Sequence, residues 1–299
     1  MRDPCGKGPR GIGWAMLVLM SALLFLPFGA AFVKSFQALD LAQPEQRGRF
    51  IGLANYRALF LQEPEFRSSL RATAITLAVG MAQCPIALGL ALWLARLWPR
   101  RLPPVLSLLM VCPLLLSQTV VALMGRLYLN DQVGLAARLL ATTGVVHQAP
   151  LASEAGAFFW VCALHAWQWV PFSTLLFWLC LQAVPQREIE AARIDGLSPA
   201  MILRAVIVPR IAGPLAAVIL IRLLEEVRLF DLPNVLTGGG PGTATLTVSM
   251  YANRITFAHQ RFGVAAAHMV LIYALVGALM LPLIRQAGRL RAMLRGKTR

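Results

Sequence analysis

Four charged side chains lie close together near residue 225, in a stretch otherwise rich in Leu, Ile and Val. Their spacing of three or four residues would bring opposite charges together on one face of a helix: Arg222, Glu225, Glu226 and Arg228. Ionisable groups at membrane depth are costly to bury and usually face a protein interior. Either these groups line a pathway for a hydroxyl-rich solute, or they form an internal ion-pair network that fixes the helix. A third interpretation is that the apolar span simply ends early, at Leu224.

Two further residue types could contribute to such a pathway. Asp231 follows the charged stretch, and four tryptophans stand in the apolar run 156–181: Trp160, Trp167, Trp169 and Trp178. Their rings could stack on sugar faces, although tryptophans also gather at membrane interfaces and in ordinary packing. The candidate pathway residues are Glu225, Glu226, Arg228, Trp167 and Asp231.

The sequence contains no complete motif for nucleotide or metal chemistry. Gly296-Lys297-Thr298 resembles the end of a phosphate-binding loop, but Arg291 stands where that motif needs its first glycine. The segment TGGGPG at 237–242 has no lysine and is typical of a turn. The histidines are scattered without metal-ligand spacing: His147, His165, His259 and His268. We expect no enzyme activity, no metal and no cofactor in this chain, and we expect His165 and His268 to be packed rather than to line a cavity.

The composition is that of a protein that crosses a membrane several times. Of 299 residues, 58% are hydrophobic and 14% are charged, whereas soluble domains average about 45–50% and about 25%. The net charge of +15 is better explained by basic residues at the cytoplasmic ends of spans than by nucleic-acid binding. The five cysteines form no Cys-x-x-Cys pair, so neither disulfides nor a zinc site are expected.

Six runs are long and apolar enough to span a bilayer, which needs about 20 residues each. They are Ile12–Val33, Ala72–Ala95, Pro104–Gly125, Gly156–Leu181, Ile211–Phe230 and Gly263–Ile284. The first run is longer than the apolar core of a cleaved signal peptide, so we interpret it as a retained span. The predicted fold class is all-α: a polytopic membrane protein with six transmembrane helices.

The distribution of Lys and Arg predicts the orientation. An even number of spans places both termini on one side, and the segments on that side hold 16 basic residues against ten on the other. Basic loops stay inside, so both termini are predicted to be cytoplasmic. The resulting boundaries are a cytoplasmic tail (1–11), a first transmembrane helix (12–36), an external loop (37–71), a permease core (72–284) and a basic cytoplasmic tail (285–299).

The stretch EIEAARIDGLSPAMILRAVIVPR at 188–210 is polar and falls between spans four and five, on the cytoplasmic side. Pro185 can begin a helix, and Gly196 is placed to end it in the left-handed region. Ser198 can cap a second helix with Pro199 at its first position, and Pro209 is expected to close that helix. The pattern predicts helix, glycine turn and helix: a rigid element that docks a cytoplasmic protein, or else an amphipathic connector on the membrane surface.

The residues that a docking partner would meet lie around the glycine. Ala191 and Ala192 would leave a smooth face for close approach, and Glu190 and Asp195 would offer carboxylates.

The segment EAARIDG, followed by nine residues and then VIVP, resembles the EAA motif of ABC importer permeases. Glu190-Ala191-Ala192 and Gly196 match it, and Val206-x-Val208-Pro209 matches in spacing. Four further blocks resemble the carbohydrate-uptake members: NYRALFLQEPEF, WQWVPF, LQAVPQREIEAARIDG and RLFDLPNVLTGGGPGTAT. The resemblance covers about residues 50–275. One departure is that Gly134 lacks the asparagine that often follows in the family, which concerns one external loop.

The resemblance implies the role of the loop, the partners and the location. Loop 185–210 would contain the coupling helix that docks on an ATP-hydrolysing subunit through Glu190, Ala191, Ala192, Asp195, Gly196 and Leu197. The partners would be a second permease, two ATP-binding subunits that hold ATP and Mg, an external solute-binding protein, membrane lipid and a sugar-like solute. The chain would lie in a bacterial inner membrane. Alternatives are import of a polyol, glycerol phosphodiester or peptide, a stand-alone channel or secondary carrier, and a receptor or scaffold that transports nothing.

Overall fold

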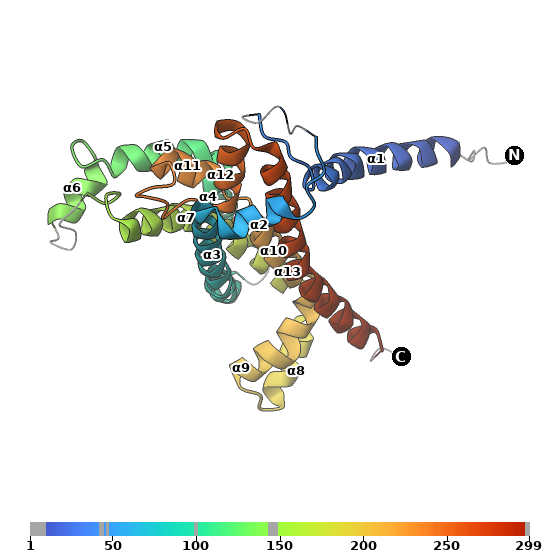
Figure 1. Cartoon of the computed structure of the whole chain (residues 1–299). Coiled ribbons are helices and arrows are strands. Elements are labelled where there is room, and N and C mark those ends of the chain that lie inside the picture. The colour runs from blue at the N-terminus through green and yellow to red at the C-terminus, as the bar shows by residue number, and fades with distance from the viewer. Residues whose placement is uncertain (1–9, 42–44, 46–47, 99–100, 143–148, 297–299) are drawn as a thin grey trace, which may run out of the picture. The chain divides into compact units, whose positions relative to one another are not determined.

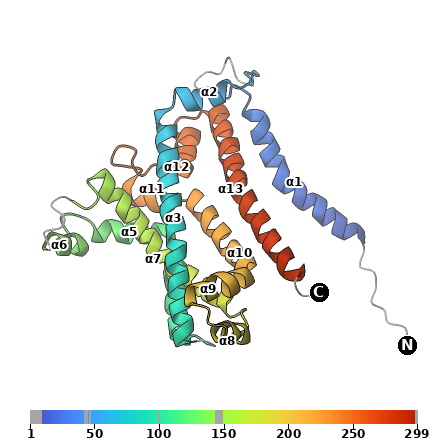
Figure 2. The same cartoon turned by 90° about the horizontal axis from the view of Figure 1, so that it is seen from below.

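A computed structural model describes residues 10–296 apart from 42–44, 46–47, 99–100 and 143–148. Over these residues the chain forms helices, with two isolated β-bridges and no β-strand (Figures 1 and 2). Most of the predicted tail 1–11, the positions of Lys297 and Thr298, and His147 lie outside the described part. The all-α fold class is confirmed. The helices divide into two units, which we describe separately: residues 1–63 with 252–274, and residues 64–251 with 275–299.

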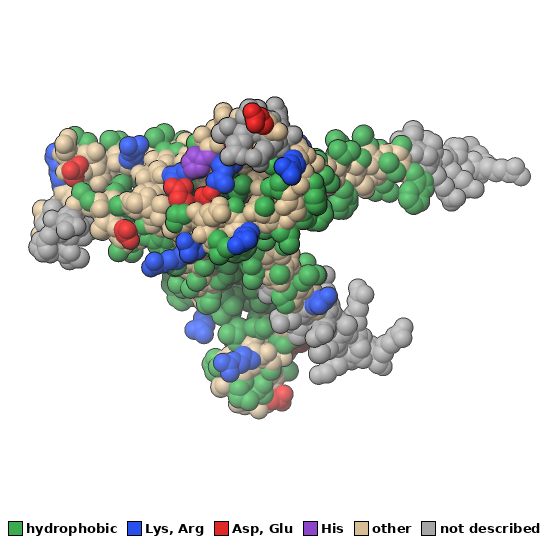
Figure 3. Space-filling view, in the orientation of Figure 1, with side chains coloured by type: hydrophobic (Ala, Val, Ile, Leu, Met, Phe, Trp, Pro, Cys, Tyr) green, Lys and Arg blue, Asp and Glu red, His purple; other side chains and the backbone are tan. Residues whose placement is uncertain are grey.

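The first unit contains α1 (Arg10–Lys34), α2 (Ala54–Leu61), the π-helical turn η3 (Arg254–Ala258) and the first part of α13 (Phe262–Gly296). Its segments are joined by Asn55, whose Nδ2 donates to the carbonyls of Ser35 at 2.8 Å and Gln37 at 2.9 Å. Large apolar side chains on α1 are exposed, as Figure 3 shows along that helix. A helix that faces lipid is expected to present such a surface.

The second unit holds the remaining helices, apart from the last two residues of α12, and the part of α13 from residue 275 onward. They are α3 (Pro64–Leu97), α4 (Pro104–Leu115), α5 (Gln118–Tyr128), α6 (Leu135–Thr142), α7 (Glu154–Leu181), α8 (Gln186–Ile194), α9 (Pro199–Ile202), η2 (Leu203–Ile207), α10 (Val208–Val227), α11 (Asp231–Thr237) and α12 (Val248–Asn253). Helix α3 packs along α7 and α10. Ala87 and Ala91 on α3 are fully buried and share a core cluster with Phe177 and Trp178 of α7. Such small side chains let two membrane helices approach closely.

Four helical segments are long and apolar enough to cross a membrane: Gly13–Lys34, Pro64–Leu97, Pro199–Thr237 and Phe262–Pro282. A fifth results if α4 and α5 are counted as one broken span, bent by 86°. Helix α7 covers the predicted span Gly156–Leu181 with 28 residues, but its tryptophans, His165 and Gln168 lower its hydropathy below that of the four. Several membrane-spanning helices are therefore established.

The predicted third span, Pro104–Gly125, is not one continuous helix. Leu116 is extended, and the Ser117 Oγ accepts from the backbone N–H of Val120 to start α5. A serine N-cap of this kind begins a new helix and fixes a change of direction. The Gln168 side chain donates to the carbonyl of Leu116 at 3.0 Å, so α7 satisfies a backbone group that the break leaves free.

Two predicted helix ends also differ. Helix α3 begins at Pro64, ahead of the predicted Ala72, because the buried Phe66 and Ser69 extend its packed face. The predicted external loop 37–71 therefore includes α2 and the first turns of α3. Pro209 does not close the second short helix: α9 continues through the π-helical turn into α10, whose first turn contains that proline. The wide π turn accommodates a residue that has no N–H to donate.

Candidate functional site

The predicted helix–glycine–helix geometry at 185–210 is confirmed. Helix α8 follows Pro185, and Gly196 has φ +78°, in the left-handed region. The N–H of Leu197 reaches the carbonyl of Ala192 at 3.1 Å, which closes the end of α8. The Ser198 Oγ then accepts from the N–H of Met201, with Pro199 at the first position of α9. Helices α8 and α9 lie beside each other at one end of the second unit (Figure 2).

An ion pair joins the two arms of this loop. The Arg210 guanidinium makes a two-point contact with the Glu188 carboxylate, and the Nε–Oε2 distance is 2.9 Å. Between the arms lies a groove of about 360 Å³, lined among others by Ala191, Ala192 and Leu197. The pair therefore spans the base of the loop while its tip stays open.

The predicted docking residues divide by exposure. Glu190, Ala191, Asp195 and Gly196 are exposed, Leu197 is half-buried and Ala192 is buried. The expected smooth face of two alanines is therefore wrong for Ala192, which packs between the two arms. Within the described part of the chain, neither Glu190 nor Asp195 has an ion-pair partner, so both carboxylates are available to another protein.

Sequence reasoning missed Ile194, which stands at the tip of the same loop. Its side chain is 86% exposed, more than any other large apolar side chain in the described residues. The sequence could have indicated this exposure, because Ile194 stands between the charged Arg193 and Asp195 in a polar helix. A single exposed isoleucine is common on protein surfaces, so its exposure alone assigns Ile194 no role.

The four charged residues near position 225 form a buried pair and a second pair in which Arg228 is exposed and Glu225 is partly exposed. Arg222 and Glu226 are 2% and 1% exposed, and Arg222 Nη2 lies 2.6 Å from Glu226 Oε1. The same nitrogen donates to the Gln83 Oε1 at 2.9 Å, and His165 Nδ1 lies 3.3 Å from the Glu226 carboxylate. The guanidinium also lies 5.0 Å from the centre of the Trp169 ring. For this pair the structure favours the internal network over an open pathway wall.

A glycine makes room for this buried cluster. A Cβ atom on Gly80 would overlap the carboxylate of Glu226. Gly80 stands one helical turn before Gln83 on α3, so the two positions face α10 together. Sequence reasoning did not connect Gln83 or His165 to the charges, because their sequence separation from Glu226 gives no local signal.

The other pathway candidates remain accessible. The Arg228 and Glu225 side chains are 77% and 28% exposed and lie 3.9 Å apart. Trp167 is 48% exposed and Asp231 is exposed in the first turn of α11. These four positions stay candidates, since a second subunit could cover them.

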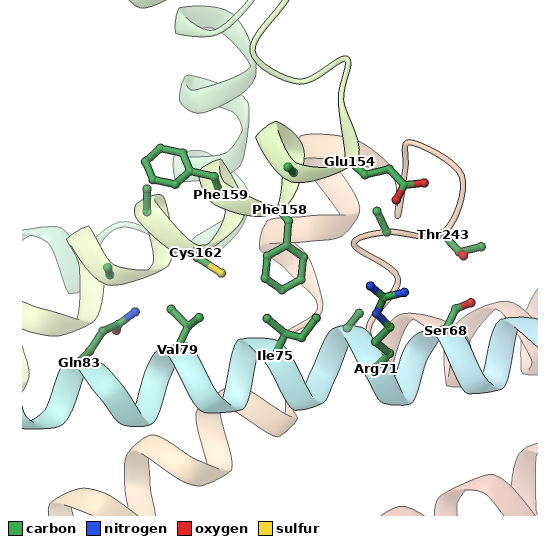
Figure 4. A pocket seen from close by; sticks show the side chains of 15 residues that line it. Ser68, Arg71, Ile75, Val79, Gln83, Glu154, Phe158, Phe159, Cys162 and Thr243 are labelled. Atoms are coloured by element: carbon green, nitrogen blue, oxygen red, sulfur yellow. The ribbon is translucent and has the colours of Figure 1, made fainter. Parts of the chain in front are cut away.

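The second unit also contains a cavity of about 840 Å³ between α3, α7 and the segment around Thr243. Figure 4 shows Arg71 and Ser68 at one end of the α3 lining and Gln83 at the other. Glu154 and Thr243 border the first end, and Ile75, Val79 and Phe158 line the middle. None of the five predicted pathway residues lines this cavity.

The glycine-rich segment beside the cavity is a turn, as predicted. Gly238 ends α11 with φ +64°, and the hydroxyls of Thr237 and Thr245 lie 2.6 Å apart across the turn. His165 and His268 are both 2% exposed, as expected for packed histidines. No group of three possible metal ligands occurs among the described residues.

Several apolar helices, with an interior ion pair and a loop that carries exposed carboxylates, are those of a multi-pass membrane protein. The chain belongs to the family of binding-protein-dependent transport system inner membrane components, which it matches over residues 85–288. It is a permease subunit and not an enzyme, because in this family ATP hydrolysis belongs to a separate subunit. The resemblance to ABC importer permeases is thereby confirmed.

Curated relatives match nearly the whole chain. The trehalose/maltose transport system permease protein MalF of Thermococcus litoralis is 30% identical and covers 87% of each chain. The sulfoquinovosyl glycerol permease SmoG of Agrobacterium fabrum is 29% identical, over 90% of this chain and 87% of that one. The trehalose permease SugA of Mycobacterium tuberculosis is 30% identical, over 91% and 85%.

A solved structure shares the fold. The crystal structure of a bacterial ABC transporter that imports the acidic polysaccharide alginate superposes with a TM-score of 0.71. It is 17% identical in sequence and covers 93% of this chain and 95% of the solved chain. At this identity the comparison shows the fold alone.

Proposed function

We propose that this chain is one of two related permease subunits that form the pathway of an ABC importer for a sugar or sugar-like solute. The names of the relatives support the solute class, since they transport trehalose, maltose and sulfoquinovosyl glycerol. The second permease would complete a pathway at the subunit interface. The exposed positions Arg228, Trp167 and Asp231, and the partly exposed Glu225, would then face that pathway.

The observation that carries the proposal is the loop with Gly196 at positive φ and free carboxylates at Glu190 and Asp195. Such a loop is suited to dock in a cleft of an ATP-binding subunit that offers basic side chains. ATP and Mg would be bound by that partner. Closure of two ATP-binding subunits would pull the loop and switch the bundle between inward-open and outward-open states.

The continuity of the helix after the loop supports this transmission. From Pro199 to Val227 the chain is helical without interruption, through α9, η2 and α10. A displacement at the loop would thus reach Arg222 and Glu226 through one helix, at the point where α10 contacts α3 and α7.

We place the chain in the inner membrane with six spans, counting α7 as one and the broken pair α4–α5 as another. Both termini, the basic tail 285–299 and loop 185–210 would be cytoplasmic, with external loop 37–71 on the other side. An external solute-binding protein would deliver the solute. The alginate transporter has been solved in complex with a periplasmic protein bound to an alginate pentasaccharide, which is consistent with such a partner.

A second candidate is import of a different polar solute. Relatives that are 27% identical include the sn-glycerol-3-phosphate permease UgpA of Brucella abortus. Arg228 is 77% exposed and lies 3.9 Å from Glu225, so its guanidinium could also contact an anionic solute.

The test is reconstitution of the permease pair with its ATP-binding subunits and binding protein in proteoliposomes. Uptake of labelled trehalose, maltose and sn-glycerol-3-phosphate is measured with and without ATP inside. ATP-dependent uptake of a sugar is expected. Uptake of glycerol phosphate alone would favour the second candidate, and uptake that needs neither ATP nor the binding protein would identify a stand-alone carrier.

A further inference from the structure

Gln83 lies where the buried ion pair meets the cavity. Gln83 is only 8% exposed but lines the cavity of about 840 Å³. Its Oε1 accepts a hydrogen bond from Arg222. No described residue accepts a hydrogen bond from its Nε2. Figure 4 shows its side chain at the opposite end of the cavity wall formed by α3 from Arg71 and Ser68.

The orientation of this amide follows from the chemistry of arginine. A guanidinium has donors only, so it can face the amide oxygen but not the amide NH₂. The NH₂ group must then point away from Arg222, toward the cavity. Rotating the amide would set donor against donor in a buried site, where an unsatisfied polar group is costly.

The guanidinium itself is held in place. It bonds Glu226 at 2.6 Å and lies over the Trp169 ring, while His165 contacts the same carboxylate. Gly80 allows Glu226 to approach α3 closely enough for this arrangement. The amide of Gln83 is thus preorganised by residues from α7 and α10.

We propose that Gln83 is a solute-binding residue whose amide NH₂ donates a hydrogen bond to an oxygen of a neutral, polyhydroxylated solute in the cavity. Arg222 and Glu226 are positioning residues for that amide. This inference rests on the proposed sugar import and adds the cavity between α3 and α7 to the pathway.

The remaining lining fits the same chemistry. Arg71 and Glu154 place opposite charges at the other end, so the cavity does not favour an anion or a cation as a whole. Phe158 offers an aromatic face between the two polar ends, suited to the apolar face of a sugar ring. A volume of about 840 Å³ falls within the range of about 300–1,000 Å³ usual for small-molecule sites.

The experiment uses the complete reconstituted complex with saturating trehalose-loaded binding protein, and with the maltose-loaded form in parallel. It measures the sugar imported per ATP hydrolysed. Gln83→Glu keeps the shape and an oxygen for Arg222 but removes the NH₂ donor. We expect the ratio to fall about tenfold, the upper range for one hydrogen bond, while ATP turnover stimulated by the binding protein is retained.

Gln168→Glu is the matched control, because it removes the amide of another buried glutamine that bonds only the carbonyls of Pro113 and Leu116. It should reduce the yield of assembled complex but leave the sugar-to-ATP ratio of that complex unchanged. An equal fall in both variants would indicate a merely structural effect and would overturn the inference.

A second measurement tests the inference if the Gln83→Glu variant fails to assemble. Cys162 lines the same cavity, so trehalose should slow its alkylation in a complex whose other cysteines are replaced. Gln83→Met, which is close in shape and has no donor, should abolish that protection. Unchanged protection of Cys162 in Gln83→Met, or an unchanged sugar-to-ATP ratio in Gln83→Glu, would overturn this inference but not the proposed function. A wild-type complex that imports neither trehalose nor maltose would overturn both.

Discussion

Arg210 and Glu188 are 22 residues apart in sequence and form a two-point ion pair that joins the two arms of the helix–glycine–helix loop. Both side chains are partly exposed, and such pairs contribute only about 0.2–1 kcal/mol. The pair is therefore better suited to hold the geometry of the loop than to stabilise the whole fold.

Reversing one charge of this pair should loosen the loop. Glu188→Arg is expected to lower ATP turnover stimulated by the loaded binding protein about two- to fivefold, with normal membrane insertion. The double variant Glu188→Arg/Arg210→Glu restores the pair and should recover most of the loss. A double variant as impaired as the single one would show that the two residues act separately.

Gly196 should resist replacement because of its backbone angle alone. Its φ is +78° and a Cβ there would meet nothing within 4 Å, so the cost of Gly196→Ala is one of backbone strain, about 1–2 kcal/mol. Gly277→Ala is the matched control, because it has the same open space without the positive φ. Co-purification of the ATP-binding subunit should fall for Gly196→Ala only.

Glu190 should contribute charge to the same docking surface. Glu190→Ala removes an exposed carboxylate that has no partner within the described chain, so the permease itself should fold and insert normally. Loss of one side of a buried intersubunit charge pair costs about 2–5 kcal/mol of binding. If ATP-binding subunits remain attached and fully stimulated in this variant, loop 185–210 is not the coupling element.

Neighbouring acids on α10 should behave differently. Glu226→Gln leaves the buried Arg222 without its counter-charge, which costs about 3–5 kcal/mol, so lower thermal stability and yield are expected. Glu225→Gln changes a side chain that is 28% exposed, so assembly should be normal and transport impaired if Glu225 faces the pathway. Thermal unfolding in detergent and uptake assays separate the two effects, and normal transport by Glu225→Gln would make that residue peripheral.

Gly80→Ala should disturb the same cluster from α3. The added Cβ would overlap the Glu226 carboxylate, whereas Gly89→Ala on the same helix places its Cβ in open space. Overpacking of this kind costs about 1–3 kcal/mol. A lower unfolding temperature for Gly80→Ala but not for Gly89→Ala is expected; equal temperatures would show that the cluster adjusts without cost.

Reporter fusions test the orientation. A fusion after Arg187 should report cytoplasm, and fusions at Glu154 and Thr243 should report the external side, because basic residues mark the cytoplasmic loops. A cytoplasmic signal at Thr243 would contradict the six-span arrangement.

The sequence by itself determined the features that depend on local chemistry. Apolar runs identify membrane helices because the bilayer demands about 20 residues of low polarity regardless of fold. Gly196, Ser198 and Pro199 specify the turn of the loop because a positive φ, an N-cap and a first helical position are each local requirements. The resemblance of the motif to the family then predicted a docking function for that loop.

The tertiary structure alone decided which residues meet across helices. Arg222 could pair with Glu225 or Glu226, since both spacings are allowed on a helix; packing against Gly80, Gln83 and His165 selected Glu226. The break between α4 and α5 and the burial of Ala192 likewise follow from contacts made by α7 and by the second arm of the loop. Contacts between residues as distant as Gln83 and Arg222, 139 positions apart, leave no periodic trace in the sequence, because only packing brings them together.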